Sequence, residues 1–70
     1  MKNNIRVERA IARMTQQQLA EQVGVSRQTI VAIEAGKYVP STVLALKIVH
    51  IFGRSFDDVF QLEEEDWQKE

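Results

Sequence analysis

Apolar residues recur at helical spacing through most of the chain and predict helices rather than strands. On the fourth predicted helix, Leu44, Ile48 and Ile51 form the longest apolar face. On the third, Ile30 and Ile33 form a shorter face that points inward. The expected helices cover residues 5–13, 16–23, 27–35 and 42–52, and a short fifth helix opens at residues 55–58.

Capping residues mark several of these helix ends. Thr15 and Gln18 have the spacing of a capping box at the start of the second helix. Ser26 is a good N-cap for the third helix, and Gly24 can adopt the left-handed conformation that ends the second. These signals leave only residues 24–26 as a turn between the two helices.

Two segments fit the helical pattern less well. In the first helix, Glu8 stands where the pattern calls for an apolar residue. Either that helix is rotated so that Val7 and Ile11 face inward, or Glu8 is paired at the edge of the domain. Residues 60–62 alternate apolar and polar like a short strand, whose only plausible partner is residues 1–4. The sequence predicts an all-α fold, with room for a small two-stranded antiparallel sheet from the two termini.

The length of 70 residues predicts one small domain over residues 1–70, with a core that is marginally stable by itself. No cysteine is present, so neither disulfides nor thiolate zinc sites can reinforce it. His50 is the single histidine, and we expect neither a metal nor a cofactor. Self-association is the remaining way to complete the core. No segment is apolar enough to span a membrane, and with no export signal we expect a cytoplasmic protein.

The net charge of −1 conceals an uneven distribution along the chain. Residues 1–54 carry eight Lys or Arg against three Glu, whereas residues 55–70 carry one Lys against seven Asp or Glu. The body is therefore basic and the C-terminal segment is acidic. Because the two parts differ in sign, the net charge does not argue against a polyanionic partner. We expect the acidic run at residues 63–66 to be a solvated tail that faces away from such a partner.

Residues 16–35 have the spacing of a helix-turn-helix. Small Ala20 lets the two helices cross closely, and Gly24 permits the sharp turn. Five apolar positions hold the helices to each other and to the rest of the domain, namely Leu19, Val23, Val25, Ile30 and Ile33. In this motif the second helix enters the major groove of DNA.

The same stretch carries a longer pattern: Gln16-x-x-Leu19-Ala20, then Gly24 to Ile30, then Ile33-Glu34-x-Gly36-Lys37-x-x-Pro40-Ser41. This pattern resembles the XRE or Cro-type, lambda-repressor-like regulators, and the resemblance extends from about residue 4 to residue 62. The segments Arg27–Ile30 and Gly36–Tyr38 are similar to the cytolysin-repressor-like subgroup. The resemblance implies a five-helix domain with a small antiparallel sheet from the two termini, acting as a homodimer.

Polar or small side chains occupy the side of the third helix that would face the groove. Gln28 is the strongest candidate for reading a base, because glutamine can bond bidentately to adenine. Arg27 can read a guanine in the same way or bind a phosphate, and both interpretations stay open. Thr29 and Ala32 can contact a thymine methyl group.

Contacts with the DNA backbone are expected from residues around the motif. The candidates are Gln16, Ser26, Lys37, Tyr38 and Arg13. In the resembled family the glutamine at the position of Gln16 contacts the backbone, whereas Arg13 lies just before the second helix and can add a screened charge. The resemblance also places Arg9 and Glu34 at positions that form a buried or half-buried ion pair between the first helix and the end of the third.

The segment from about residue 54 to residue 67 carries more large apolar side chains than the core of one protomer needs. They are Phe56, Val59, Phe60, Leu62 and Trp67. The surplus predicts a dimer interface. A two-fold dimer would place its recognition helices about 34–36 Å apart and would bind an inverted repeat.

We therefore expect a homodimeric regulator of transcription that binds double-stranded DNA of defined sequence and acts as a repressor. An antitoxin-type or other protein-interaction module could use the same fold, and this alternative stays open. An enzyme is poorly supported, because the sequence has no nucleophile and base pair, no metal cluster and no glycine loop for phosphate.

Overall fold

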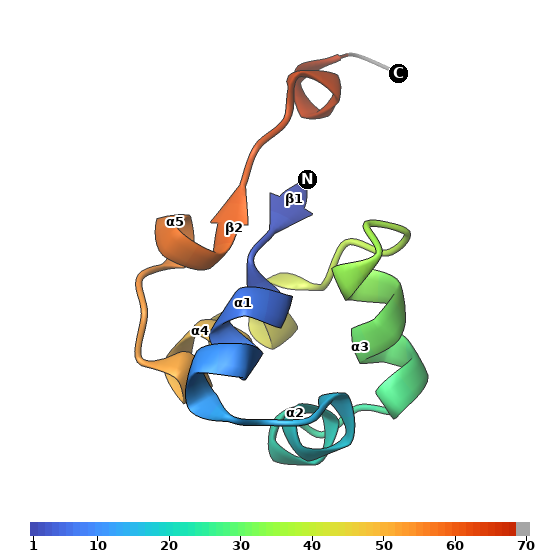
Figure 1. The fold of residues 1–70 in the computed structure, drawn as a ribbon. Helices are drawn as coiled ribbons and strands as arrows, with labels where there is room; N and C mark the ends of the chain where they lie inside the picture. Colours follow the sequence, from blue (N-terminus) through green and yellow to red (C-terminus); the bar gives the residue numbers. More distant parts are fainter. Residues whose placement is uncertain (69–70) are drawn as a thin grey trace.

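Five α-helices, a two-stranded sheet and a C-terminal 3₁₀ turn make up the computed structural model, which describes residues 1–68 (Figure 1). The helices are α1 (Ile5–Ala12), α2 (Gln16–Val23), α3 (Arg27–Glu34), α4 (Thr42–Phe52) and α5 (Phe56–Val59). The strands are β1 (Lys2–Asn3) and β2 (Phe60–Gln61), and the 3₁₀ turn η1 is Glu64–Trp67. The predicted five-helix fold with a terminal sheet is confirmed. The last two residues of the predicted acidic segment, Lys69 and Glu70, lie outside the described residues.

The two strands join the ends of the domain. They run antiparallel, with Lys2 opposite Gln61 and Asn3 opposite Phe60. The side-chain amide of Asn3 also donates to the carbonyl oxygen of Ile33 at 2.9 Å. The N-terminal strand is therefore tied to the end of α3 as well as to β2.

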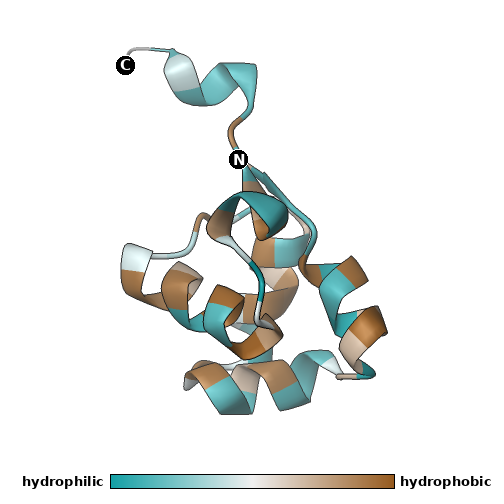
Figure 2. Ribbon diagram, turned by 90° about the vertical axis from the view of Figure 1, so that its left-hand side faces the viewer, coloured by the Kyte–Doolittle hydropathy of each residue, from teal (hydrophilic) through white to brown (hydrophobic). Residues whose placement is uncertain are grey.

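The core lies where all five helices converge. Its largest fully buried side chains are Ile5, Leu19, Val23, Ile30, Ile33, Ile48 and Val59. Ala20 is also completely buried, and the predicted inner faces of α2 and α3 are those observed. In Figure 2 the helices of the body carry both hydrophobic and hydrophilic residues, whereas the turn η1 is almost entirely hydrophilic. None of the helices described is long and apolar enough to cross a membrane.

The predicted caps are present at the start of α2 and at both ends of the turn between α2 and α3. Thr15 Oγ1 accepts from the Gln18 amide at 3.0 Å, and Gln18 Oε1 accepts from the Thr15 amide at 2.9 Å. Ser26 Oγ accepts from the Thr29 amide at 3.3 Å. Gly24 has a φ of 76°, which glycine adopts without strain. These caps fix where α2 and α3 begin and how sharply the chain turns between them.

Helix α1 differs from the prediction in its end and resolves the question of its buried face. It ends at Ala12, and Arg13 has a φ of 54° in the left-handed region instead of continuing the helix. Val7 and Ile11 are 56% and 69% exposed, so the rotated helix was the wrong alternative. Glu8 is only 6% exposed and accepts a hydrogen bond from Arg54 Nε at 3.2 Å. This arginine supplies the counter-charge that lets a carboxylate lie at the edge of the core.

The C-terminal apolar residues divide into two groups, which corrects part of the predicted dimer interface. Val59 is completely buried in the core of its own protomer, whereas Phe60 is 3% exposed and lines a surface groove with Phe56 and Leu62. Phe56 is exposed, although its ring lies 5.1 Å from that of Phe60. Leu62 and Trp67 are exposed. Only these last three of the five predicted residues are exposed.

Residues 64–68 of the acidic segment are exposed, as expected of a solvated tail, but the segment also pairs with the N-terminus. The Met1 ammonium group lies 3.1 Å from Asp66 Oδ2 and 3.2 Å from Glu63 Oε1. The Glu63 amide also donates to the Asp66 carboxylate at 2.7 Å. These contacts hold η1 beside the terminal sheet, at the end of the molecule opposite α2 (Figure 1).

Candidate nucleic-acid interface

The first turn of α3 presents two polar side chains to solvent. Arg27 and Gln28 are exposed, and within residues 1–68 neither side chain hydrogen-bonds to another part of the chain. Thr29 and Ala32 are half-buried. The Thr29 hydroxyl lies 3.1 Å from the Ser26 hydroxyl, so it belongs to the helix cap. Arg27 and Gln28 are therefore the donors that α3 can extend toward a ligand.

A half-buried ion pair joins α1 to the end of α3. Arg9 Nε lies 2.6 Å from Glu34 Oε2, and Arg9 Nη2 lies 3.0 Å from Glu34 Oε1. The third guanidinium nitrogen, Nη1, donates to the Met14 carbonyl oxygen at 3.0 Å. Hydrogen bonding to Glu34 raises the pKa of Arg9, so the guanidinium stays charged. Sequence reasoning placed these two residues together, and the structure puts them in bidentate contact.

Gln16 also contacts the Arg9–Glu34 pair. Its side-chain amide donates to Glu34 Oε1 at 3.2 Å, and the residue is half-buried. Gln16 is also the first residue of α2, where backbone N–H groups have no acceptor inside the helix. The start of α2 is thus fixed by a contact with the end of α3.

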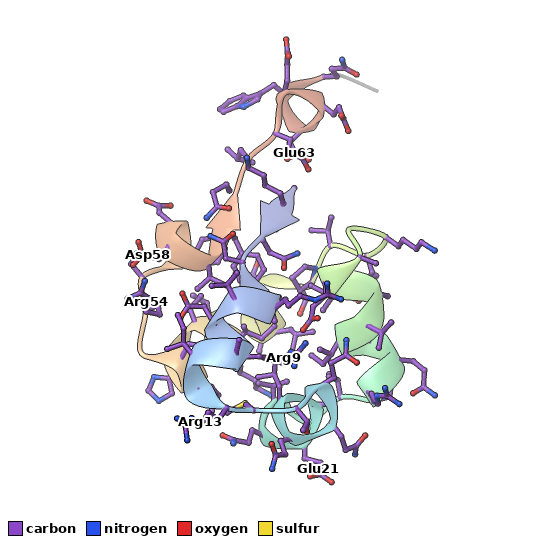
Figure 3. The ribbon with its side chains drawn as sticks, viewed as in Figure 1. Arg9, Arg13, Glu21, Arg54, Asp58 and Glu63 are labelled. Atoms are coloured by element: carbon purple, nitrogen blue, oxygen red, sulfur yellow. The ribbon has the colours of Figure 1, made fainter. Side chains whose placement is uncertain are left out.

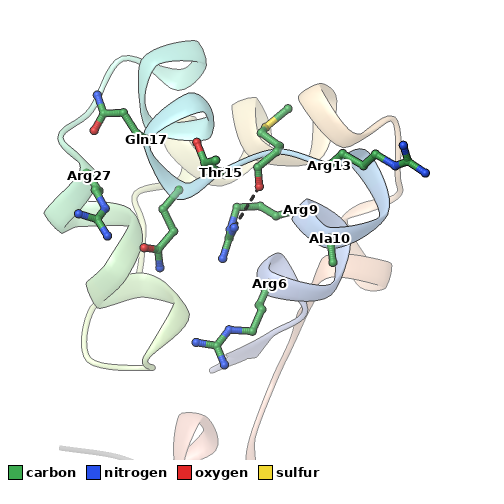
Figure 4. A pocket seen from close by; sticks show the side chains of 9 residues that line it. Arg6, Arg9, Ala10, Arg13, Thr15, Gln17 and Arg27 are labelled. Atoms are coloured by element: carbon green, nitrogen blue, oxygen red, sulfur yellow. Dashed lines mark hydrogen bonds between the residues drawn. The ribbon is translucent and has the colours of Figure 1, made fainter.

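The remaining backbone candidates lie apart from one another. Ser26 caps α3, whereas Lys37 and Tyr38 are exposed in the loop that follows α3. Arg13 is exposed at the end of α1 (Figure 3). Its side chain points away from α3 and from Arg27 (Figure 4). The structure therefore brings Gln16 and Arg27 near one another and leaves Arg13 at the far edge.

An open basic cleft lies between α1 and the α2–α3 pair (Figure 4). Its volume is about 740 Å³, and its lining includes Arg6, Arg9, Arg13 and Arg27 but no acidic residue. Sequence reasoning missed Arg6. The signal was the spacing of 6 and 9, which places two arginines on one side of α1.

Within residues 1–68, no three His, Asp or Glu side chains gather as metal ligands would. The polar groups around α3 are instead cations and amides, which suit a polyanion. The geometry is that of a helix with an exposed first turn and a basic cleft beside it.

A family model described as helix-turn-helix matches residues 5–59 of this chain. The chain belongs to the helix-turn-helix family. The match spans α1 to α5 and includes the whole of the α2–turn–α3 unit. This helix-turn-helix protein is thus a regulator of transcription with a DNA-binding domain, and not an enzyme.

Two relatives match nearly the whole chain. One is an uncharacterized HTH-type transcriptional regulator of Methanocaldococcus jannaschii, 50% identical over 66 residues, covering 94% of this chain and 100% of the relative. The other is an uncharacterized HTH-type transcriptional regulator of Bacillus subtilis, 53% identical over 66 residues with the same two coverages.

Solved structures agree with this fold. A provisionally named DNA-binding protein from Bacteroides fragilis superimposes with a TM-score of 0.75 at 29% identity, covering 83% of this chain and 94% of that one. The clp gene regulator ClgR of Corynebacterium glutamicum superimposes with a TM-score of 0.72 at 31% identity, covering 77% of this chain and 57% of its own.

Proposed function

We propose that this helix-turn-helix protein represses transcription by binding an inverted repeat in double-stranded DNA as a homodimer. The observation that carries the proposal is the exposed first turn of α3, where Arg27 and Gln28 have no partner within residues 1–68. Gln28 reads a base in the major groove, and Arg27 reads a base or binds a phosphate. Thr29 contributes its methyl group, and Ala32 lies one turn further along the same helix.

Backbone contacts orient the helix in the groove. Gln16 and Ser26 bring the starts of α2 and α3 to the phosphates. Lys37 and Tyr38 reach the backbone from the loop after α3, and Arg13 adds a more distant charge. The Arg9–Glu34 pair acts indirectly, because it fixes the angle between α1, α2 and α3.

The proposed dimer forms through the C-terminal half of the domain. Phe56 and Leu62 line an apolar groove of about 440 Å³ that also includes Met1. Trp67 is 75% exposed on η1, an unusual position for a large aromatic ring in a protomer that stays alone. Burial of these side chains would supply the apolar contact area that a core of this size lacks.

Selection of bound duplexes from a random library, at a stated salt concentration, tests the DNA part of the proposal. We expect an inverted repeat with half-sites about one helical turn apart. Affinity should fall steeply as salt increases, because bound phosphates release counterions. Failure to enrich any sequence, or an affinity that does not respond to salt, would contradict the proposal.

Sedimentation of the protein at micromolar concentration tests the dimer separately. A dimer is expected, and a monodisperse monomer would contradict this part. Replacing Trp67 by Ala should shift the population toward monomer. A stoichiometric partner protein that co-purifies with the chain would favour the protein-interaction module instead. Since double-stranded DNA is the proposed ligand, we expect the protein to act in the cytoplasm.

A further inference from the structure

The side chain of Asn3 makes two hydrogen bonds to helices that are far apart in the sequence. Its Nδ2 donates to the Ile33 carbonyl oxygen near the end of α3 at 2.9 Å, and its Oδ1 accepts from the Ile5 amide at the start of α1 at 3.2 Å. A helix leaves its first amides and its last carbonyls without partners inside it, and an asparagine side chain offers both an acceptor and a donor. One side chain of β1 therefore serves the beginning of one helix and the end of another, and Figure 1 shows β1 between β2 and the end of α3.

The chain leaves α3 through a tight turn that determines where the next residues lie. The Lys37 amide donates to the Ala32 carbonyl oxygen at 2.9 Å. The Gly36 amide donates to the Ile33 carbonyl oxygen at 3.0 Å, and Gly36 has a φ of 75°, so the turn is a Schellman motif. Within residues 1–68, Asn3 is the only side chain that hydrogen-bonds to the backbone of this turn. The turn is thus held by its own amides and by one donor from β1.

Resting on the proposed function, we propose that Asn3 is a positioning residue for Lys37, because it holds the turn from which Lys37 reaches the DNA backbone. Asn3 itself does not contact DNA, since it is half-buried and both of its polar side-chain atoms are hydrogen-bonded within the chain. Lys37 is exposed and directly follows Gly36. A lysine side chain is flexible, so a fixed backbone limits the conformational freedom that its ammonium group loses on binding a phosphate.

The proposal gives the terminal strand a part in DNA recognition. β1 pairs with β2, so the bond from Asn3 ties the turn after α3 to the C-terminal half of the domain. The next residue, Asn4, is bonded in another direction. Its Nδ2 donates to the Asp58 carbonyl oxygen in α5 at 3.0 Å, and it makes no contact of this kind with α3. Two adjacent asparagines therefore differ in the helix that each one holds, and Asn4 provides a matched control for Asn3.

Hydrogen exchange in the free protein tests the contact without DNA. Asn3→Ala is compared with Asn4→Ala, which removes one side-chain hydrogen bond of similar length and none to α3. The Lys37 amide should exchange about fivefold faster in Asn3→Ala than in Asn4→Ala, as expected for the loss of one ordinary hydrogen bond. Equal exchange rates in the two variants would overturn the proposal. If Asn3→Ala does not fold, Asn3→Asp removes the donor and keeps the acceptor for the Ile5 amide.

Binding to DNA tests the consequence for Lys37. Lys37→Gln is introduced into the unsubstituted protein, into Asn3→Ala and into Asn4→Ala. Affinities for a duplex selected from a random library are then measured at several salt concentrations. In the unsubstituted protein and in Asn4→Ala, Lys37→Gln should make the slope of log K against log salt shallower by about 1. In Asn3→Ala the same substitution should change the slope by less than half as much. A loss of stability alone does not produce this difference, because each comparison is made within one background.

The outcomes separate the role of Asn3 from that of Lys37. If Lys37→Gln changes the slope as much in Asn3→Ala as in the unsubstituted protein, Asn3 does not position Lys37. If Asn4→Ala reduces the effect of Lys37→Gln as strongly as Asn3→Ala does, the terminal strand as a whole is responsible and the assignment to Asn3 is wrong. If Lys37→Gln leaves the slope of the unsubstituted protein unchanged, the backbone contact of Lys37 fails as part of the proposed function. The exchange rates report separately on whether Asn3 holds the turn.

Discussion

Gln28 and Arg27 are adjacent on α3, and substituting each one tests its own proposed role. Replacing Gln28 by Ala removes a bidentate partner for one base and should cost about 1–3 kcal/mol of discrimination at that base pair. Binding to an unrelated duplex should change little, because phosphate contacts are retained. Competition binding against single base-pair variants of the selected site measures this loss. Equal weakening for every duplex would assign Gln28 to the backbone instead.

The same competition assay decides the role of Arg27. If Arg27 reads a guanine, Arg27→Ala relaxes the preference at one position of the half-site. If it binds a phosphate, all duplexes lose affinity by the same factor and the salt dependence becomes shallower.

Arg13 is the one described non-glycine residue with a positive φ, and its conformation predicts a stability gain. A left-handed conformation costs an L-residue about 1–2 kcal/mol, and glycine avoids this cost. Arg13→Gly should therefore raise the free energy of unfolding by about 1 kcal/mol, less the extra chain entropy of glycine. Urea unfolding measures the change. Ala10→Gly, at an exposed position inside α1, is the control and should destabilise by about 1 kcal/mol.

At the scale of helices, the Glu34 carboxylate joins α1, α2 and α3. It accepts from Arg9 and from Gln16, and its side chain is only 5% exposed. Glu34→Ala would leave the Arg9 charge without its partner and should cost about 3 kcal/mol of unfolding free energy. This is the lower end of the cost of breaking a buried ion pair, because Arg9 is less deeply buried than Glu34. DNA binding should weaken with it. A melting temperature equal to that of Glu21→Ala, an exposed glutamate on α2, would contradict this.

Helix and cap positions could be predicted from the sequence because their causes are local. Thr15, Ser26 and Gly24 act within a few residues of themselves, and the apolar stripes follow the helix period. The Glu8–Arg54 pair joins residues 46 positions apart, and only the packed fold brings them together. The basic cleft is a similar case, since it gathers side chains from three helices.

The mistaken part of the dimer interface has a different cause. An apolar side chain is favoured equally in a core and in an interface, so composition could not separate Val59 from Leu62. Their separation depends on how the short helix α5 turns into β2. Val59 is the last residue of α5 and is buried in the core, whereas Leu62 comes directly after β2 and is exposed.

At the scale of the whole molecule, the contact between Met1 and η1 should depend on pH. Hydrogen bonding to Asp66 and Glu63 raises the pKa of the Met1 amino group above its ordinary 8.0. The backbone amide of Glu63, and then the ammonium group, lower the pKa of Asp66 below its ordinary 3.8. The contact is complete between these limits. It is lost when pH rises through the raised amino pKa or falls through the lowered carboxyl pKa.

Trp67 is the single tryptophan and follows Asp66 directly, so its fluorescence reports this contact. We expect a fluorescence transition above pH 8 that disappears when the N-terminus is acetylated. An identical alkaline transition in the acetylated protein would assign the signal to another group.

The pairing of β1 with β2 also bears on the order in which the chain folds. Lys2 pairs with Gln61, so this contact closes a loop of nearly the whole domain, whereas α2 and α3 meet across a turn of three residues. Closing the larger loop costs more entropy, and the terminal contacts should form last and open first. In hydrogen exchange, the Asn4 amide, bonded to the Val59 carbonyl oxygen at 2.8 Å, should lose protection before the Val25 amide, bonded to that of Ala20 at 3.0 Å. The α2–α3 surface proposed to meet DNA would then survive fluctuations that separate the two ends of the chain.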